Sequence, residues 1–161
     1  MKTLEILDKT EIEAIINACD CCIVSSTTTD GLPYALPMNF FYEAGELVLH
    51  SAPVGMQVSN IQANPHVCIV FLQSGALVYQ HVDVACSYRM QGKSVICNGK
   101  VSFVDDIGHK MELLNKFMHK YTGRTDFKYS EPALKNVKVW LVDITQITAR
   151  AFGVPVPKLK V

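Results

Sequence analysis

The stretch from Asp30 to Gln57 constrains the fold more than any other part of the chain. It opens with Asp30-Gly31, a dipeptide that tolerates the positive φ angles of a two-residue hairpin turn. The strand-like run Leu32–Tyr42 follows, and Pro33 and Pro37 interrupt it. Because proline has no N–H to donate to a neighbouring strand, two prolines in one strand predict the edge of a sheet, with backbone groups left free for a ligand.

The second half of this stretch brings the end of a strand to the start of a helix. Glu46–His50 alternates in polarity as a strand does, and we expect it to pair with Leu32–Tyr42 in an antiparallel meander. Ser51–Gly55 then breaks the strand, and a helix is predicted over residues 54–63. Because the first N–H groups of a helix lack partners within it, Ser51 and the amides around Gly55 form a predicted anion site.

The rest of the chain predicts further antiparallel strands and two more helices. A Thr10–Glu13 capping box and apolar spacing indicate a helix over residues 10–19, and Met111, Leu114 and Phe117 share one face of a helix over residues 107–121. The other predicted strands are Cys21–Thr28, His66–Leu72, Ala76–Val84, Lys93–Val104 and Val137–Thr148, with a turn at Gln73-Ser74-Gly75 and an extended tail over residues 151–161. About seven strands in hairpin order predict a single, mainly β, antiparallel barrel domain over residues 1–161.

The composition narrows the class of protein. Of 161 residues, 49% are hydrophobic and 19% are charged. That balance is apolar for a small monomer and predicts a homodimer in which a partner subunit covers part of the surface. The formal net charge is zero and Lys and Arg form no stripe, so we expect no nucleic-acid partner. We find neither an export signal nor an apolar run of membrane-spanning length, so we expect a cytoplasmic location and no membrane partner.

Six cysteines occur, at positions 19, 21, 22, 68, 86 and 97. They form no C-x-x-C pair, and without an export signal we expect reduced thiols packed as small apolar residues. The pairs His66-x-Cys68 and His81…Cys86 lack the spacing of metal ligands. No metal site is therefore predicted.

Several motifs, taken in order, resemble the flavin-binding split-barrel family related to pyridoxamine phosphate oxidase, and within it the nitroimidazole-resistance (Nim-type) branch. The matching residues are Pro33-Tyr34, Pro37, Asn39, the LVLHSA run ending at Ala52, Gly55, Asn64–Cys68, Lys93–Ile96 and Gly99-Lys100. The resemblance covers about residues 10–150. It implies a Greek-key split barrel that dimerises with a flavin between the subunits, FMN in preference to FAD.

The resemblance also implies the cofactor contacts. They are Pro37, Met38, Asn39 and Phe40 at the flavin ring, His50, Ser51, Ala52, Gly55, Met56 and Gln57 at the ring edge and the phosphate, and Lys93 and Ser94 in a later strand. Relatives usually have Lys or Arg at one or both of the positions that Met56 and Gln57 occupy in this chain. Either Arg89, Lys93 or Arg150 supplies the missing cation, or the pocket takes FAD, whose pyrophosphate extends outward.

His50 is the predicted catalytic residue. It closes its strand where the family places a pocket histidine, and we expect its side chain at the rim of the barrel, where an imidazole can donate a hydrogen bond or a proton. The expected activity is flavin-dependent reduction of small nitro-aromatic (5-nitroimidazole-like) or quinone-like compounds. The alternatives are a flavin-binding sensor or stress protein without turnover, pyridoxamine phosphate oxidase itself, and a haem-handling relative with His50 or His81 as ligand.

Overall fold

The computed structural model describes residues 3–154, which form one antiparallel sheet with helices around it. The strands are β1 (Thr3–Glu5), β2 (Cys22–Thr27), β3 (Pro33–Met38), β4 (Phe40–Glu43), β5 (Glu46–Ser51), β6 (His66–Val78), β7 (Arg89–Val104) and β8 (Lys138–Phe152). The helices are α1 (Lys9–Asn17), α2 (Met56–Ala63), α3 (Ile107–Thr122) and α4 (Glu131–Lys135), with a short 3-10 helix, η1 (Ala85–Ser87). Most of the predicted tail, residues 155–161, lies outside the described residues.

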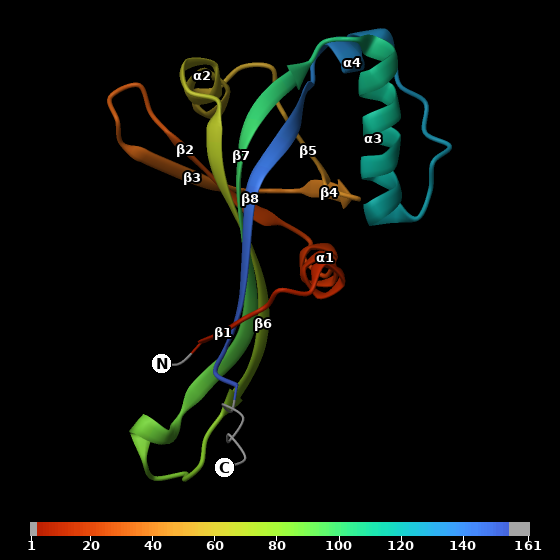
Figure 1. Ribbon diagram of the computed structural model, residues 1–161. Coiled ribbons are helices and arrows are strands. Elements are labelled where there is room, and N and C mark those ends of the chain that lie inside the picture. The colour runs from red at the N-terminus through yellow and green to blue at the C-terminus, as the bar shows by residue number, and fades with distance from the viewer. Residues whose placement is uncertain (1–2, 155–161) are drawn as a thin grey trace.

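The sheet curls because its two edge strands are neighbours in the chain. The strand order is β3-β2-β6-β7-β8-β5-β4, and β1 pairs with β8 (Figure 1). Only Asn39 separates β3 from β4, so the two edges of the sheet meet there. We call this junction, Met38–Asn39–Phe40, the seam. The predicted fold, a mainly β antiparallel split barrel, is confirmed.

The predicted meander is wrong, because Leu32–Tyr42 is not one strand. Pro33–Met38 pairs with β2 at one edge of the sheet, whereas Phe40–Glu43 pairs with β5 at the other. At the seam, the Tyr121 hydroxyl bonds to both the N–H and the carbonyl of Phe40, groups that a neighbouring strand would otherwise satisfy. The chain can therefore pass from the β3 edge of the sheet to the β4 edge. Both prolines do lie in an edge strand, as their missing N–H groups predict.

β6 and β7 form a long ribbon that extends well beyond the barrel (Figure 1). The predicted turn at Gln73-Ser74-Gly75 is wrong, because β6 continues to Val78 and β7 already begins at Arg89. The register shifts between Ser74 and Leu77, so the glycine marks a bulge in a continuous strand. We call the far end of this ribbon, residues 77–90, the arm.

Two hydrophobic clusters pack on opposite faces of the curled sheet. The cluster inside the barrel is closed by α1 and α2 and includes the fully buried residues Ile16, Phe40, Leu49, Phe71 and Trp140. The second cluster lies outside the barrel, where α3 and α4 cover β4, β5 and β8 with Leu113, Phe117 and Leu134. Strand alternation therefore sends Phe40 inward and its neighbour Phe41 outward.

The helices lie close to the predicted positions but differ in their caps and faces. α1 is capped by Asp8 rather than by the predicted Thr10, since the Asp8 carboxylate accepts from the N–H groups of Thr10 and Glu11. α2 begins at Met56, so the predicted helical residue Val54 lies outside it. α3 buries Lys110, Leu113, Leu114 and Phe117, which leaves the predicted core residue Met111 exposed.

All six cysteines are free thiols. Burial raises the pKa of the Cys22 and Cys97 thiols to about 12, so both act as apolar core residues. Within residues 3–154, no three His, Cys, Asp or Glu side chains gather closely enough to hold a metal ion. None of the described helices has the length and apolar character needed to cross a membrane.

Candidate functional site at the seam

The seam is tied from outside the barrel by the last turn of α3. The Phe40 N–H donates to the Tyr121 hydroxyl at 2.9 Å, and that hydroxyl lies 2.9 Å from the Phe40 carbonyl and 2.8 Å from the Asp20 carbonyl. The Asn39 amide donates to the same Asp20 carbonyl at 3.1 Å. Met38 and Phe40 point into the core, so Pro37 and Asn39 are the predicted ring contacts whose side chains are exposed.

Lys120 places a cation directly behind the seam. Its Nζ lies 3.1 Å from the centre of the Phe40 ring and donates to the Cys19 carbonyl at 3.1 Å. Burial lowers the pKa of this ammonium group to about 8. Neither Lys120 nor Tyr121 was predicted as a site residue, although Tyr121 follows Phe117 at the i, i+4 spacing of one helix face.

His50 lies on the outer face of the barrel wall rather than at its rim. It pairs with Val139 of β8, and its ring meets the Phe117 ring under α3, with centroids 4.5 Å apart. Burial lowers the pKa of the imidazole, so the ring is neutral at pH 7. Neither ring nitrogen is hydrogen-bonded within residues 3–154, which leaves one donor and one acceptor for a bound molecule.

Ser51 ends β5 opposite Lys138, a residue that was not predicted to belong to the site. The Ser51 hydroxyl accepts from the Trp140 indole N–H at 3.1 Å and donates to the Ala52 carbonyl at 2.8 Å. Its cross-strand partner is the half-buried Lys138, whose Nζ lies 4.8 Å from the centre of the Phe103 ring. Lys138 takes part in none of the ion pairs of the described residues, so its charge is available to an anion at this end of the barrel.

The two residues at the start of α2 have opposite orientations. Gly55, with φ of 140°, precedes the helix, and no side chain caps its first N–H groups. Met56 is 58% exposed, whereas Gln57 is only 7% exposed. The Gln57 amide oxygen accepts from the Ser26 hydroxyl at 3.1 Å, and Asn60 donates to that hydroxyl at 3.3 Å. The Gln57 side chain therefore fastens α2 to β2.

Pro37 begins a row of apolar side chains on the outer face of the sheet. It pairs with Ile23, Ile23 pairs with Val70, and Val70 pairs with Ile96. Because cross-strand partners point to the same side, these four side chains form a continuous row of about 14 Å, or three strand spacings. We call it the bare row, since Ile23 is 40% and Ile96 is 37% exposed. Ser94, two residues from Ile96 along β7, lies on the same face.

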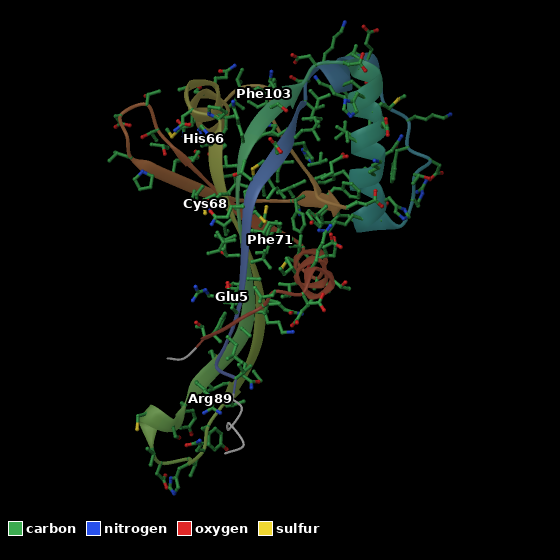
Figure 2. The ribbon with its side chains drawn as sticks, in the orientation of Figure 1. Glu5, His66, Cys68, Phe71, Arg89 and Phe103 are labelled. Carbon is green, nitrogen blue, oxygen red and sulfur yellow. The ribbon has the colours of Figure 1, made fainter. Side chains whose placement is uncertain are left out.

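The three cations predicted to replace the missing charge are engaged elsewhere. Arg89 donates to the Gly153 carbonyl at 2.8 Å, Lys93 pairs with Glu11 of α1 at 2.7 Å, and Arg150 donates to the Thr3 hydroxyl at 3.4 Å. Figure 2 shows Arg89 at the base of the arm, at the opposite end of the ribbon from His66. Within one chain, the structure therefore does not bring Arg89 to the start of α2.

Comparison with known proteins identifies the family. A family model described as pyridoxamine 5'-phosphate oxidase matches residues 8–151. The chain belongs to the pyridoxamine 5'-phosphate oxidase family. Among solved structures, a candidate 5-nitroimidazole antibiotic resistance protein from Bacteroides thetaiotaomicron is 45% identical, covering 93% of this chain and 87% of that one with a TM-score of 0.85. The resemblance to the Nim-type branch of the family is thereby confirmed.

Two more distant structures share the fold of this family member. An FAD and haem binding protein from Mycobacterium smegmatis is 15% identical, with 94% of this chain and 75% of that one covered and a TM-score of 0.82. An FAD-binding protein from Mesorhizobium loti is 22% identical, with 94% and 99% covered and a TM-score of 0.67. No curated protein sequence matches the chain.

Proposed function

We propose that the chain binds a flavin at the seam and reduces small nitro-aromatic compounds of the 5-nitroimidazole type, or quinone-like compounds. Membership of the pyridoxamine 5'-phosphate oxidase family and the 45% identity to a candidate nitroimidazole-resistance protein support this proposal. The observation that carries it is His50, a neutral, half-buried imidazole with both nitrogens unpaired among the described residues. The Phe117 ring lies between His50 and Tyr121, with its centroid 4.5 Å from that of the His50 ring and 5.2 Å from that of the Tyr121 ring. The Tyr121 hydroxyl in turn bonds to the backbone of the seam.

The residues around the seam fit the parts of a flavin. The uncapped N–H groups at the start of α2 and the unpaired charge of Lys138 suit a phosphate. Pro37 and the bare row offer an apolar surface for the ring, and the exposed Asn39 lies next to it. These groups come from β2, β3, β6, β7, β8 and α2, so the fold must be complete before the site exists.

A bound flavin supplies the electrons, and the chain's own residues act on the substrate. Two-electron reduction of a nitro group places negative charge on its oxygen. The His50 N–H can donate to that oxygen, and the Phe117 ring holds the imidazole in position. A positioned donor of this kind contributes about 100- to 10,000-fold in rate.

We propose that the active form is a homodimer with the flavin at the subunit interface. The bare row gives one copy an apolar strip that a second copy can cover. Since Pro37 ends this row and also borders the seam, a partner on the row also adjoins the proposed flavin site. Ser94 lies on the same face and could then contact the flavin from either copy.

The test is stopped-flow reoxidation of the reduced flavoprotein by a 5-nitroimidazole, after an absorbance spectrum has confirmed bound flavin. We expect His50→Ala and His50→Gln to slow reoxidation at least about 100-fold while flavin is retained. His66→Gln is the matched control, because His66 is exposed and, among residues 3–154, its ring bonds only to the Asn64 side chain. Equal rates in all variants would remove His50 from the chemistry. Bound flavin that no nitro or quinone compound reoxidises faster than oxygen would instead favour the sensor role.

A further inference from the structure

A cavity of about 250 Å³ lies where the second half of α3 meets the end of β4. Its lining includes Phe41 and Glu43 from the strand and Glu112, Asn115 and Lys116 from the helix. Figure 1 shows β4 ending beside α3, on the outer side of the barrel. Glu43 and Glu112 are exposed, so the cavity is open to solvent. We call it the α3 cavity.

Two carboxylates lie side by side on the strands next to this cavity. Glu43 and Glu46 are cross-strand partners, so both side chains lie on the outer face of the sheet, with Cβ atoms about 5 Å apart. Like charges in this arrangement repel each other, and neither residue takes part in an ion pair within residues 3–154. The Glu46 Oε1 atom is buried and accepts no hydrogen bond from the described residues. Because a buried carboxylate oxygen without a donor is costly, this pair favours a bound cation.

The helix wall of the α3 cavity adds further acceptors. The Asn115 Oδ1 atom is also buried and accepts no hydrogen bond within residues 3–154. Glu112 lies 3.9 Å from Lys116, a long ion pair, and its side chain is 65% exposed. α3 ends at Thr122, so the partial negative charge of the helix C-terminus also lies close to the cavity. Three glutamates and an unpaired amide oxygen thus outweigh one lysine and one histidine.

The spacing of these acceptors selects the kind of cation. A metal ion needs several ligands within about 2.0–2.6 Å of one point. No three His, Cys, Asp or Glu side chains of residues 3–154 are gathered closely enough for that. A guanidinium group instead has five N–H donors in a planar fork, which can bond to acceptors on two walls at once. Its flat face can also pack on the Phe41 ring in the cavity wall.

We propose that the α3 cavity binds a small guanidinium compound, whose N–H groups donate to Glu43 and to the Asn115 amide oxygen. Its volume of about 250 Å³ is slightly below that of pockets for drug-sized ligands, so a compound of only a few heavy atoms fits. The proposal requires no flavin and is therefore independent of the proposed function. Since Lys120 and Tyr121 of the same helix hold the seam, a ligand that joins α3 to β4 also stabilises the helix turn behind the seam.

The test is calorimetric titration of the purified protein with ethylguanidinium and with ethylurea, a neutral compound of nearly the same shape. We expect a dissociation constant of about 1 mM or lower for ethylguanidinium, and binding at least about tenfold weaker for ethylurea. Glu43→Gln should weaken ethylguanidinium binding at least about tenfold. It should also raise the melting temperature of the ligand-free protein, because it removes the repulsion from Glu46. Asn115→Ala should weaken binding several-fold.

Asp105→Asn is the matched control, because Asp105 is exposed and lies outside the cavity lining. It changes the net charge equally and should leave the affinity unchanged. Equal affinity for ethylguanidinium and ethylurea would overturn the proposal, as would equal losses of affinity in Glu43→Gln and Asp105→Asn. A blocked Gly-Arg-Gly peptide that bound more tightly than ethylguanidinium would assign the cavity to an arginine of a partner protein, which would also overturn it.

Discussion

The outer face of the curled sheet has two apolar regions, and the chain covers only one of them. Over β4, β5 and β8, α3 and α4 bury Phe41, Val48 and Val139 to 9% exposure or less. Across β3, β2, β6 and β7, the bare row leaves Ile23 and Ile96 more than a third exposed. Strand alternation produces both regions equally, so an apolar outer face shows that a cover is required but not which molecule supplies it.

The region covered by α3 and α4 is held together by buried hydrogen bonds as well as by apolar packing. The Lys110 side chain is 7% exposed, and its Nζ donates to the carbonyls of Leu134 at 3.4 Å and Val137 at 3.2 Å. These bonds join α3 to α4 and to the start of β8. Among the described residues, no side-chain hydrogen bond of this kind crosses the bare row, whose members are neighbours through strand pairing. We therefore expect the covered region to support folding and the bare row to support association.

The largest expected effect is that of Phe117→Ala in the covered region. Phe117 is 4% exposed and contacts both His50 and Tyr121, so its loss leaves a cavity under α3 and should lower the free energy of unfolding by about 3–5 kcal/mol. Ile96→Ala in the bare row should cost about 1 kcal/mol or less when measured on the monomer. Urea unfolding at low protein concentration checks both values, and similar losses would show that the two regions do not differ.

The next effect is that of Ile96→Lys on association. A charge at the β7 end of the bare row should weaken the homodimer by at least about 2 kcal/mol, or roughly 30-fold in dissociation constant. Sedimentation velocity from nanomolar to micromolar protein measures this change. Ile107→Lys is the matched control, because Ile107 is 40% exposed on α3 and lies outside the row. A dimer that tolerates Ile96→Lys would show that the partner binds elsewhere.

The smallest effect concerns pH and the buried imidazole of His50. Burial under α3 lowers the pKa of His50 in the folded state, so the unfolded chain binds its proton first on acidification. The stability that neutral His50 contributes is fully present above about pH 6.5, the pKa of histidine in the unfolded chain. It is lost as the pH falls through the lower pKa that His50 has in the folded state. His50→Gln should flatten the pH dependence of the unfolding free energy over this acidic window, which urea unfolding at a series of pH values measures.

The sequence predicted well whatever depends on one residue and its neighbours. The missing N–H groups of Pro33 and Pro37 placed β3 at an edge, and strand alternation placed His50 near the end of β5. The failures concern partners distant in the chain. Lys138 meets Ser51 only because β8 pairs with β5, and Tyr121 reaches the seam only because α3 packs back on the sheet. Local patterns carry no signal for either contact.

Local sequence patterns also could not predict that Met56 is exposed and Gln57 is buried. The resemblance implies a basic residue at one or both positions, but it does not say which side chain faces outward. In the structure, the Met56 side chain is exposed and the Gln57 side chain is buried against Ser26. Similarly, the glycine in Gln73-Ser74-Gly75 indicates an irregularity, but a bulge and a turn have the same composition. Only the pairing of β6 with β7 distinguishes them.

The central place of β8 in the strand order has a consequence for how the chain is made. β8 pairs with β7 on one side and β5 on the other, and also with β1 near the start of the chain. Until residues 138–152 have left the ribosome, the β4–β5 hairpin has no strand to join it to the remainder of the sheet. The barrel therefore cannot close before β8 has been made, and such long-range pairing folds slowly, in milliseconds to seconds. Until then the growing chain exposes unpaired strand edges, the kind of surface through which unfinished chains aggregate.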